Sequence, residues 1–281
     1  MQRVEETAYA KLNLTLAVTG RRAHGYHTIQ SLFQSVSLCD RLVLERRETG
    51  FMLNEVEKIP AGENIIARAD RLLRRECPLL GGVAVMLEKN IPTEAGLGGG
   101  SADAAAYLRG MNRLYGLGMD SRRLCCLAEE LGADVPFCVD GGTAVATGVG
   151  EILQPVKSCL PLHLVVIKPD MGCSTREMYR RIDEMGDRLW QRFTAKEAAE
   201  ALAAGDLAGL CSCLYNVFEE VVALPELEMI RRELRQSGAL AAQMTGSGSA
   251  IFGIYPTEAA ARAAAERLGQ THWAVYCRST G

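Results

Sequence analysis

Four glycines fall within five residues of the sequence, from Gly96 to Gly100, after a stretch of alternating apolar residues and before an alanine-rich one. Glycine lets backbone N–H groups turn inward, because no Cβ is in the way. We expect a helix to start at Ser101, and its first amides would lack helical acceptors and carry a partial positive charge. Residues 92–102 therefore predict a binding site for an anion, most often a phosphate.

Two standard phosphate-binding motifs do not match these glycines. A P-loop requires a lysine directly after its last glycine, but Gly100 is followed by Ser101. The dinucleotide fingerprint G-x-G-x-x-G reaches Asp103 at its last position when counted from Gly98, and Ser101 when counted from Gly96. A tight strand-to-helix connection is the alternative, but four glycines cost more conformational entropy than such a connection needs.

A lysine and an asparagine share one face of an expected strand near the N-terminus. The alternation through residues 9–18 places Lys11 and Asn13 side by side. The opposite face is apolar and consists of Leu12, Leu14, Leu16 and Val18. The polar face is either solvated or part of a site. The loop that follows, residues 20–27, is rich in glycine, arginine and histidine and favours a site.

Asp134 stands just beyond an expected helix end and two residues before Pro136, which stiffens the turn. The preceding helix is expected to begin after Asp120, to run to Leu131 and to stop at Gly132. A lone aspartate in such a turn is more often a cap or turn residue than a base. Asp134 is therefore a catalytic candidate only together with the other motifs.

A second glycine cluster, residues 244–250, lies between two short strand-like stretches. Taken alone it predicts a hairpin turn. Its Thr and Ser hydroxyls and its amides could also hold a phosphate or close over the first glycine loop.

The order of the expected elements indicates an α+β protein with a soft boundary near residues 155 to 160. Before the boundary, we expect strands over 9–18, 30–44 (interrupted at Cys39 and Asp40), 50–58, 83–87 and 143–147, and helices from Asn64, over 101–115 and over 120–131. After it, strands 162–167, 239–243, 251–255 and 273–277 alternate with helices in an order compatible with a split βαβ sandwich. The predicted domains are residues 1–157 and 158–281.

Composition excludes several classes of protein. The chain has 281 residues, is 48% apolar, and carries a net charge of -3, so no basic excess indicates nucleic acid. No stretch approaches the length of a membrane span, and the first six residues do not start a signal peptide. The ten cysteines include no C-x-x-C pair and are expected to be reduced thiols rather than zinc ligands or disulfides. We expect a soluble cytoplasmic protein; its oligomeric state is not encoded in any pattern here.

The ordered set of motifs resembles the GHMP kinases, the superfamily of galactokinase, homoserine kinase and mevalonate kinase. The pattern Pro92-x-x-x-Gly96-Leu97-Gly98-Gly99-Gly100-Ser101-Ala102 resembles their ATP loop, and Gly246-Ser247-Gly248 resembles their C-terminal glycine motif. Five further segments resemble the branch that phosphorylates a cytidine-diphosphate-linked methylerythritol: residues 10–14, 25–27, 32–34, 132–137 and 148–151. The resemblance spans about residues 8 to 255 in the usual order.

The resemblance implies a fold and a reaction. The N-terminal domain would be of the ribosomal protein S5 domain 2-like type, and the C-terminal domain would be a ferredoxin-like α/β sandwich. The enzyme would use ATP and Mg²⁺ to phosphorylate the 2-hydroxyl of the cytidylyl substrate, in the non-mevalonate route to isoprenoid precursors. A different small alcohol, such as homoserine or mevalonate, is the alternative acceptor; neither carries a base for residues 25–27 to recognise. A third alternative is a nucleotide-binding regulator on an inactive kinase scaffold. Such proteins usually lose the base or the cation, and the presence of both Lys11 and Asp134 argues against this alternative.

The resemblance also implies roles for individual residues. Asp134 matches the catalytic base and Lys11 its cationic partner, while Ser101 is a plausible Mg²⁺ ligand. The acceptor would contact Asn13, Tyr26, His27 (at the cytosine) and Thr175. The ATP loop would comprise Pro92, Thr93, Glu94, Ala95, Gly96, Leu97, Gly98, Gly99, Gly100, Ser101 and Ala102. Asn216 matches a further family segment, but Val217 replaces the acidic residue expected there.

Overall fold

The computed structural model of the chain describes residues 2–22, 25–54, 64–186, 192–222 and 224–281. The chain forms two compact units, each assembled from three segments. The first unit contains residues 1–10, 38–91 and 98–141, and the second contains 11–37, 92–97 and 142–281. Strands β1 (Arg3–Arg21) and β2 (His27–Arg47) contribute residues to both units.

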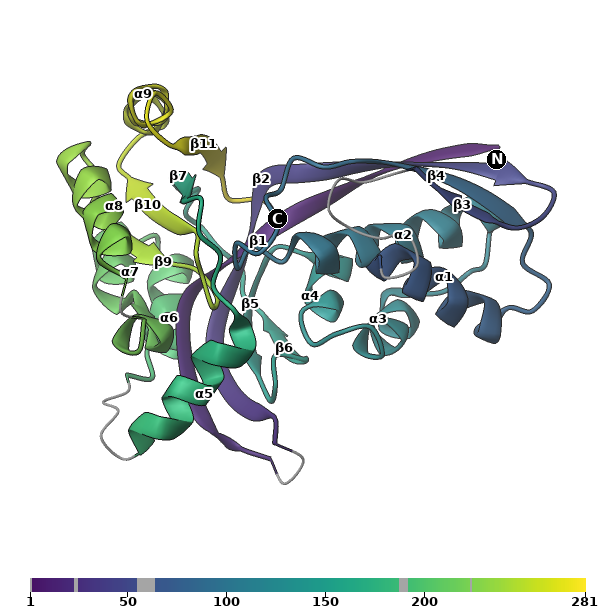
Figure 1. The fold of residues 1–281 in the computed structure, drawn as a ribbon, viewed down its shortest axis with the longest axis horizontal. Helices are drawn as coiled ribbons and strands as arrows, with labels where there is room; N and C mark the ends of the chain where they lie inside the picture. Colours follow the sequence, from purple (N-terminus) through teal and green to yellow (C-terminus); the bar gives the residue numbers. More distant parts are fainter. Residues whose placement is uncertain (1, 23–24, 55–63, 187–191, 223) are drawn as a thin grey trace. The chain divides into compact units, whose positions relative to one another are not determined.

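In the first unit, four helices lie on one face of a sheet (Figure 1). The strand order is β3-β4-β2-β1, with β4 antiparallel to β2 and parallel to β3. The remaining elements of this unit are β3 (Phe51–Leu53), β4 (Gly82–Glu88), α1 (Ile65–Glu76), α2 (Gly99–Tyr115), α3 (Ser121–Glu129) and α4 (Val135–Asp140).

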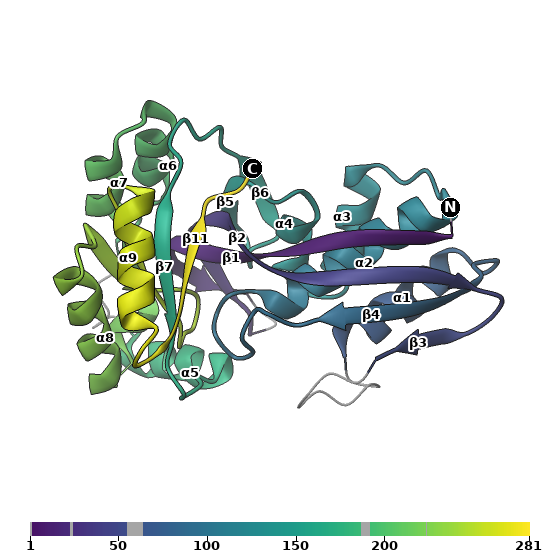
Figure 2. The same cartoon turned by 90° about the horizontal axis from the view of Figure 1, so that it is seen from above.

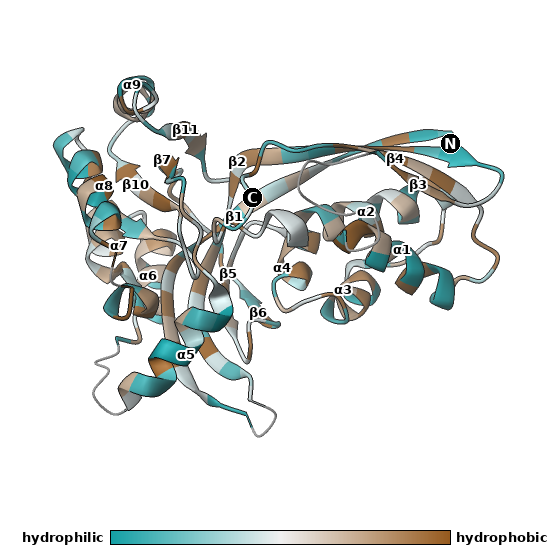
Figure 3. Ribbon diagram, in the orientation of Figure 1, coloured by the Kyte–Doolittle hydropathy of each residue, from teal (hydrophilic) through white to brown (hydrophobic). Residues whose placement is uncertain are grey.

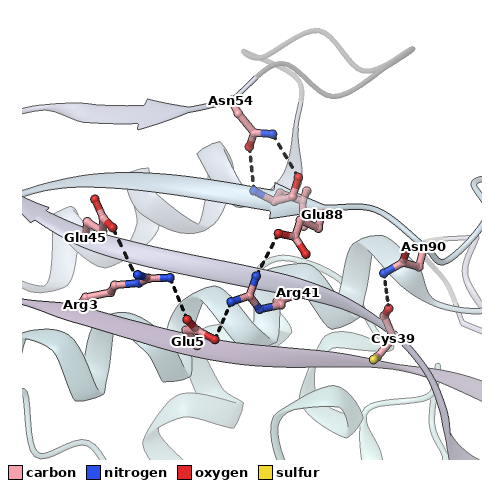
Figure 4. Close-up of polar contacts among 9 residues, drawn as sticks. Arg3, Glu5, Cys39, Arg41, Glu45, Asn54, Glu88 and Asn90 are labelled. Atoms are coloured by element: carbon pink, nitrogen blue, oxygen red, sulfur yellow. Dashed lines mark hydrogen bonds and ion pairs between the residues drawn. The ribbon is translucent and has the colours of Figure 1, made fainter.

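Helix α2 is the centre of this unit's core. Its alanines give it high helix propensity, and residues 104–106 are fully buried. At Gly110 a Cβ would lie 2.9 Å from Leu44 Cδ1, so the missing side chain lets α2 approach the sheet closely. The other sheet face is polar: Arg41 on β2 pairs with Glu5 on β1 and with Glu88 on β4, at 2.7 and 2.9 Å (Figure 4).

The second unit contains a four-stranded antiparallel sheet in the order β11-β7-β10-β9. Helix α9 runs along β7 and β11 (Figure 2), and α8 packs on β9 and β10. Helices α5 and α8 are banded hydrophilic and hydrophobic in Figure 3, as amphipathic helices are. The bounds are β7 (His163–Lys168), β9 (Ala241–Met244), β10 (Ile251–Tyr255), β11 (Trp273–Arg278), α5 (Thr175–Met185), α6 (Ala195–Ala204), α7 (Leu207–Cys213), α8 (Pro225–Gln236) and α9 (Glu258–Leu268).

Three short strands of the second unit extend the sheet: β8 (Tyr215–Asn216) pairs with β1, β5 (Thr143–Thr147) pairs with β2, and β6 (Ile152–Pro155) pairs with β5. β5 is antiparallel to β2 and to β6, while β8 is parallel to β1. A 3-10 turn, η2 (Val217–Glu220), follows β8 and buries Val217 in the core. The residue that departs from the family pattern is thus a core side chain.

The α+β class is confirmed, but several expected bounds are wrong. β2 continues through Cys39 and Asp40 without interruption, because Asp40 is bonded to neighbouring backbone rather than turned to solvent. Helix α3 ends at Glu129 rather than Leu131, and α4 and β6 were not expected. The strand expected over 50–58 spans residues 51–53, and residues 55–58 lie outside the described part. The boundary between residues 157 and 158 stays a prediction. No helix in the described ranges is long and apolar enough to cross a bilayer.

Candidate active site

The glycine loop turns into α2 earlier than expected. Gly98 has a φ of 68° and occupies the N-cap, so the helix begins at Gly99 and not at Ser101. The amide of Ala102 donates to the Gly98 carbonyl at 2.9 Å, whereas the amides of Gly99, Gly100 and Ser101 precede the first helical bond. The N-cap residue is a glycine and so offers no side chain to cap this end of α2. Three first-turn amides and the helix dipole therefore make the start of this 17-residue helix a candidate anion site.

Residues 92–97, which belong to the second unit, lie against β1 and the second glycine cluster. The Leu97 carbonyl accepts from the Lys11 amide at 2.9 Å, and the Ala95 carbonyl accepts from the Ala250 amide at 3.1 Å. Gly96 has a φ of 72°, and a Cβ there would overlap the Thr245 carbonyl oxygen. The two glycine turns are in direct backbone contact here. This geometry fits the expectation that the second turn closes on the first.

The second turn connects β9 and β10, as the hairpin pattern predicted. Asn216 is buried, and its Nδ2 donates to the carbonyls of Met244 and Gly246 at 2.8 and 2.9 Å. Its Oδ1 accepts from the Phe218 amide at 3.0 Å. Asn216 is therefore a clamp on the second turn, since it satisfies two of that turn's carbonyl groups.

Lys11 and Asn13 lie side by side on β1, as the alternation predicted. Lys11 Nζ donates to Asn13 Oδ1 at 2.8 Å, and Asn13 Nδ2 donates to Ser31 Oγ at 2.9 Å. The two residues are only 4% and 2% exposed, so the solvated-face alternative is wrong. Lys11 Nζ also lies 4.7 Å from the centre of the Phe33 ring. The Asn13 amide donates to Thr245 Oγ1 at 2.9 Å, which links this pair to the second glycine turn.

His27 stands in a contact set that the sequence did not predict. Its Nε2 lies 2.7 Å from Asp183 Oδ1, and its ring stacks on Tyr179 with centroids 4.6 Å apart. Tyr179 and Asp183 are four residues apart on α5, so they share one helix face. This i, i+4 spacing is the sequence feature from which a shared contact of Tyr179 and Asp183 could have been predicted. Tyr26 is 70% exposed.

Thr175 is the first residue of α5, and Ser174 caps that helix. The hydroxyls of Thr175 and Ser247 are 2.7 Å apart, so Thr175 contacts the second glycine turn. His27, Thr175 and the Lys11–Asn13 pair all belong to the second unit. Within that unit, three residues predicted to contact the phosphoryl-acceptor substrate lie on different elements: Asn13 on β1, His27 on β2 and Thr175 on α5.

Asp134 belongs to the first unit, together with residues 98–102. It occupies the N-cap position of α4, with Pro136 in the first turn, and it is half-buried. Its side chain makes no cap hydrogen bond to α4, so the simple capping role does not explain the aspartate.

The metal assignment rests on few protein groups. Among the described residues, no three His, Cys, Asp or Glu side chains are grouped so that they could hold a metal ion. Ser101 lies in the first turn of α2, next to the candidate anion site. This donor set suits Mg²⁺ bound mainly through phosphate oxygens and water, which is the usual mode for that ion.

Comparisons with known proteins give the class. Residues 64–142 match the GHMP kinases N terminal domain, and residues 198–275 match the GHMP kinases C terminal domain. A homoserine kinase from Cytophaga hutchinsonii superimposes with a TM-score of 0.78 at 17% identity over 100% of this chain and 95% of its own. An L. major mevalonate kinase does so at 0.79 and 20%, over 99% and 96%. At such identities these two structures show the shared fold alone. The class is a GHMP kinase with an N-terminal and a C-terminal family domain and an α+β fold.

Closer relatives give the family. A 4-diphosphocytidyl-2-C-methyl-D-erythritol kinase of Desulfitobacterium hafniense (strain Y51) is 42% identical over 99% of this chain and 96% of its own length. One from Acetivibrio thermocellus is 36% identical over the full length of both. A solved 4-(cytidine 5'-diphospho)-2C-methyl-D-erythritol kinase is 37% identical, with a TM-score of 0.87 over 99% of this chain and 100% of that one. The chain belongs to the 4-diphosphocytidyl-2-C-methyl-D-erythritol kinase family, which confirms the resemblance of its motifs.

Proposed function

We propose that this chain transfers the γ-phosphoryl group of ATP to the 2-hydroxyl of 4-(cytidine 5'-diphospho)-2-C-methyl-D-erythritol. The observation that carries the proposal is the match to kinases of that name, at 36 to 42% identity over nearly the whole chain. The reaction is a step of the non-mevalonate route to isoprenoid precursors. We further propose a cytoplasmic location, because all ten cysteines are free thiols, as a reducing compartment would keep them.

The first-turn amides of α2 are proposed to hold the phosphates of ATP. Gly99, Gly100 and Ser101 offer N–H groups that the helix itself does not use, and the glycine N-cap has no side chain to occupy them. Phosphoryl transfer depends mainly on alignment and on stabilising charge, which fixed amides supply. Residues 92–97 support this role, because their backbone hydrogen bonds to Lys11 and Ala250 fix the position of the chain just before Gly98.

Asp134 is proposed to accept the proton of the attacking hydroxyl. The hydroxyl oxygen forms a bond to the γ-phosphorus while the bond from that phosphorus to the bridging oxygen breaks, and ADP leaves. The proton moves to the carboxylate of Asp134, which is not engaged in capping α4. Lys11 is proposed to offset the developing negative charge, and Asn13 holds the ammonium through its Oδ1.

His27 is proposed to bind the cytosine. Its Nε2 lies 2.7 Å from Asp183 Oδ1, and in the tautomer whose Nε2–H group donates to that carboxylate, Nδ1 is an acceptor. The exocyclic amine of cytosine is a donor, so Nδ1 is its complement. Tyr179 supports the ring from one side, and the exposed Tyr26 is proposed to border the base. Thr175 is proposed to contact the methylerythritol end of the acceptor.

Mg²⁺ is proposed to accompany ATP, with Ser101 as its protein ligand and with phosphate oxygens and water completing its shell. When bound it would neutralise phosphate charge. Residues of the chain then align the nucleotide through the α2 amides.

A direct assay tests the proposed function. Purified protein is incubated with ATP, Mg²⁺ and the cytidylyl acceptor, while ADP release is followed and the product is identified by phosphorus NMR. We expect ADP and one new phosphomonoester in equal amounts. Homoserine and mevalonate serve as comparison acceptors, and faster turnover of either one would refute the proposal. ATP binding without turnover of any alcohol would instead favour a regulator.

A further inference from the structure

Three charged side chains of the first unit, none of them used in the proposed reaction, form a buried group that we call the loop-base cluster: Asp40, Lys89 and Asp103. Lys89 Nζ donates to Asp103 Oδ2 at 2.7 Å and also pairs with Asp40 Oδ2. Asp40 and Asp103 are 0% and 3% exposed. Burying two carboxylates around one ammonium costs desolvation and is seldom a gain in stability. A contribution to stability alone therefore does not explain why these three charges are buried together.

The cluster holds the start of the glycine loop. Asp40 Oδ1 accepts from the backbone amides of Asn90 and Ile91 at 2.6 and 2.8 Å. The Asn90 side chain also donates to the Cys39 carbonyl at 3.1 Å, as Figure 4 shows. Since Pro92 follows directly, these bonds fix the chain where it leaves β4 and enters the loop.

The cluster also holds the end of the loop. Asp103 is the fifth residue of α2, and its ion pair with Lys89 spans 14 residues of sequence. A Cβ at Gly99 would lie 2.9 Å from Ile91 Cγ2 and 3.4 Å from Lys89 Nζ. The first residue of α2 therefore rests directly on the segment that Asp40 anchors. Lys89 thus connects the residues before the loop to the helix after it.

The charges of the cluster are unbalanced. Burial raises the pKa of Asp103, and the nearby charge of Asp40 adds to this, while Lys89 opposes it. Burial acts to lower the pKa of Lys89, but Asp103 and Asp40 outweigh it, so that pKa is raised. Asp103 Oδ1 is buried without a hydrogen-bond partner among the described residues. A neutral amide at position 103 would keep the acceptor for Lys89 and remove a like charge from Asp40.

We propose that the loop-base cluster is a positioning device: it fixes the first-turn amides of α2 at the spacing that the nucleotide phosphates require. The inference rests on the proposed phosphate-binding role of residues 92–102. Lys89 and Asp103 act through the loop backbone and transfer no proton. The expected consequence is that breaking the Lys89–Asp103 link weakens nucleotide binding without changing acceptor binding.

The test compares three variants by calorimetric titration with Mg·ADP, which needs no acceptor. Asp103→Ala leaves Lys89 paired with Asp40, and we expect its ADP affinity to fall on the order of tenfold, as for one lost charge-assisted hydrogen bond. Asp103→Asn should stay within about twofold of the wild type. Asp70→Ala is the matched control, because Asp70 is similarly buried and bonds to α2 at Tyr107 (2.6 Å), one turn further along the helix than Asp103. It should lose stability and keep its ADP affinity.

Steady-state kinetics sharpen the result: Asp103→Ala should raise KM for ATP while KM for the acceptor stays unchanged. Wild-type ADP affinity in Asp103→Ala would overturn the inference, as would a loss in Asp70→Ala of the same size. Should Asp103→Ala fail to fold, a tenfold loss in Asp103→Asn would overturn it instead. If the wild type phosphorylates the acceptor but Asp103→Ala keeps wild-type ADP affinity, this inference alone is refuted. If the wild type is inactive but the variants change ADP affinity as expected, the proposed reaction alone is refuted.

Discussion

At the scale of single residues, pairing gives the site its chemistry. Lys11 is buried beside an asparagine oxygen and over an aromatic ring, so its ammonium is fixed in direction. His27 is held between a carboxylate and a tyrosine ring, and the carboxylate favours the tautomer whose Nε2 carries the proton. Asp134 stands at a helix start without capping it. Lys11 and His27 are thus more constrained than surface side chains of the same types would be.

Replacing Asp134 by asparagine should abolish most of the turnover. The amide keeps the size of the side chain but cannot accept the proton, so we expect kcat to fall by about 10²- to 10⁴-fold. Calorimetric ADP binding should be unchanged. Asp140→Asn is the control, because Asp140 lies at the other end of α4 and accepts from Ser121. A loss of less than about fivefold in Asp134→Asn would rule out a proton-accepting role.

Replacing His27 by alanine should separate the two substrates. Without Nδ1 the acceptor loses its proposed base contact, so its KM should rise at least about tenfold, while KM for ATP stays the same. Asp183→Asn, which weakens tautomer selection, should have a smaller effect in the same direction. His163→Ala is the control, since His163 contacts Tyr276 on β11 instead. An equal rise in both KM values would contradict the assignment.

At the scale of elements, the predicted helix starts at Asn64, Asp120 and Thr175 are confirmed, whereas the start of α2 is wrong and the anion site at the glycine turn stays a prediction. Four clustered glycines predicted an anion site, and positive φ values at Gly96 and Gly98 explain why glycine is needed. The start of α2 was placed two residues late, because a glycine N-cap gives no side-chain signal. The six-residue α4 was missed, since a single turn and a half carries no periodicity to detect.

Gly96→Ala should be much more destabilising than Gly116→Ala. Both glycines have positive φ, at 72° and 64°, so an alanine at either costs about 1 kcal/mol of backbone strain. At Gly96 the new Cβ would also overlap the Thr245 carbonyl, whereas nothing lies within 4 Å at Gly116. We expect urea unfolding to give a loss above about 2 kcal/mol at Gly96 and about 1 kcal/mol at Gly116. Equal losses of unfolding free energy would mean that the contact between Gly96 and the second glycine turn does not contribute to stability.

At the scale of the whole molecule, sequence order and spatial grouping diverge. Strands β1 and β2 supply both compact units, and the first glycine loop passes from the second unit to the first between Leu97 and Gly98. Local patterns predicted the elements, since periodicity depends only on neighbours. They could not predict contacts such as Asn13 with Thr245, or His27 with Asp183, which are 232 and 156 residues apart. The resemblance to a family supplied roles for residues but not these partners.

Long-range charge pairing also sets how the whole fold responds to pH. Burial and the charge of Asp40 raise the pKa of Asp103 in the folded protein, so between its unfolded and folded values the folded state binds more protons than the unfolded state. The free energy of unfolding contributed by Asp103 therefore falls as pH rises through that window. The raised pKa of Lys89 acts in a different range: its stabilisation is complete below the ordinary lysine value of 10.5 and is lost only above it.

Asp103→Asn should accordingly gain stability relative to the wild type as pH increases from 5 to 8. The amide does not titrate, so the difference in unfolding free energy should grow with pH, by at most about 1.4 kcal/mol per pH unit for one group. Urea unfolding of both proteins at matched ionic strength measures it. Side-chain hydrogen bonds to Arg180 and Arg181 lower the pKa of Glu177 to about 2. The stability that Glu177 contributes is therefore lost only at pH values below the range from 5 to 8, and the loss should be the same in both proteins. Parallel profiles would show that folding does not raise the pKa of Asp103.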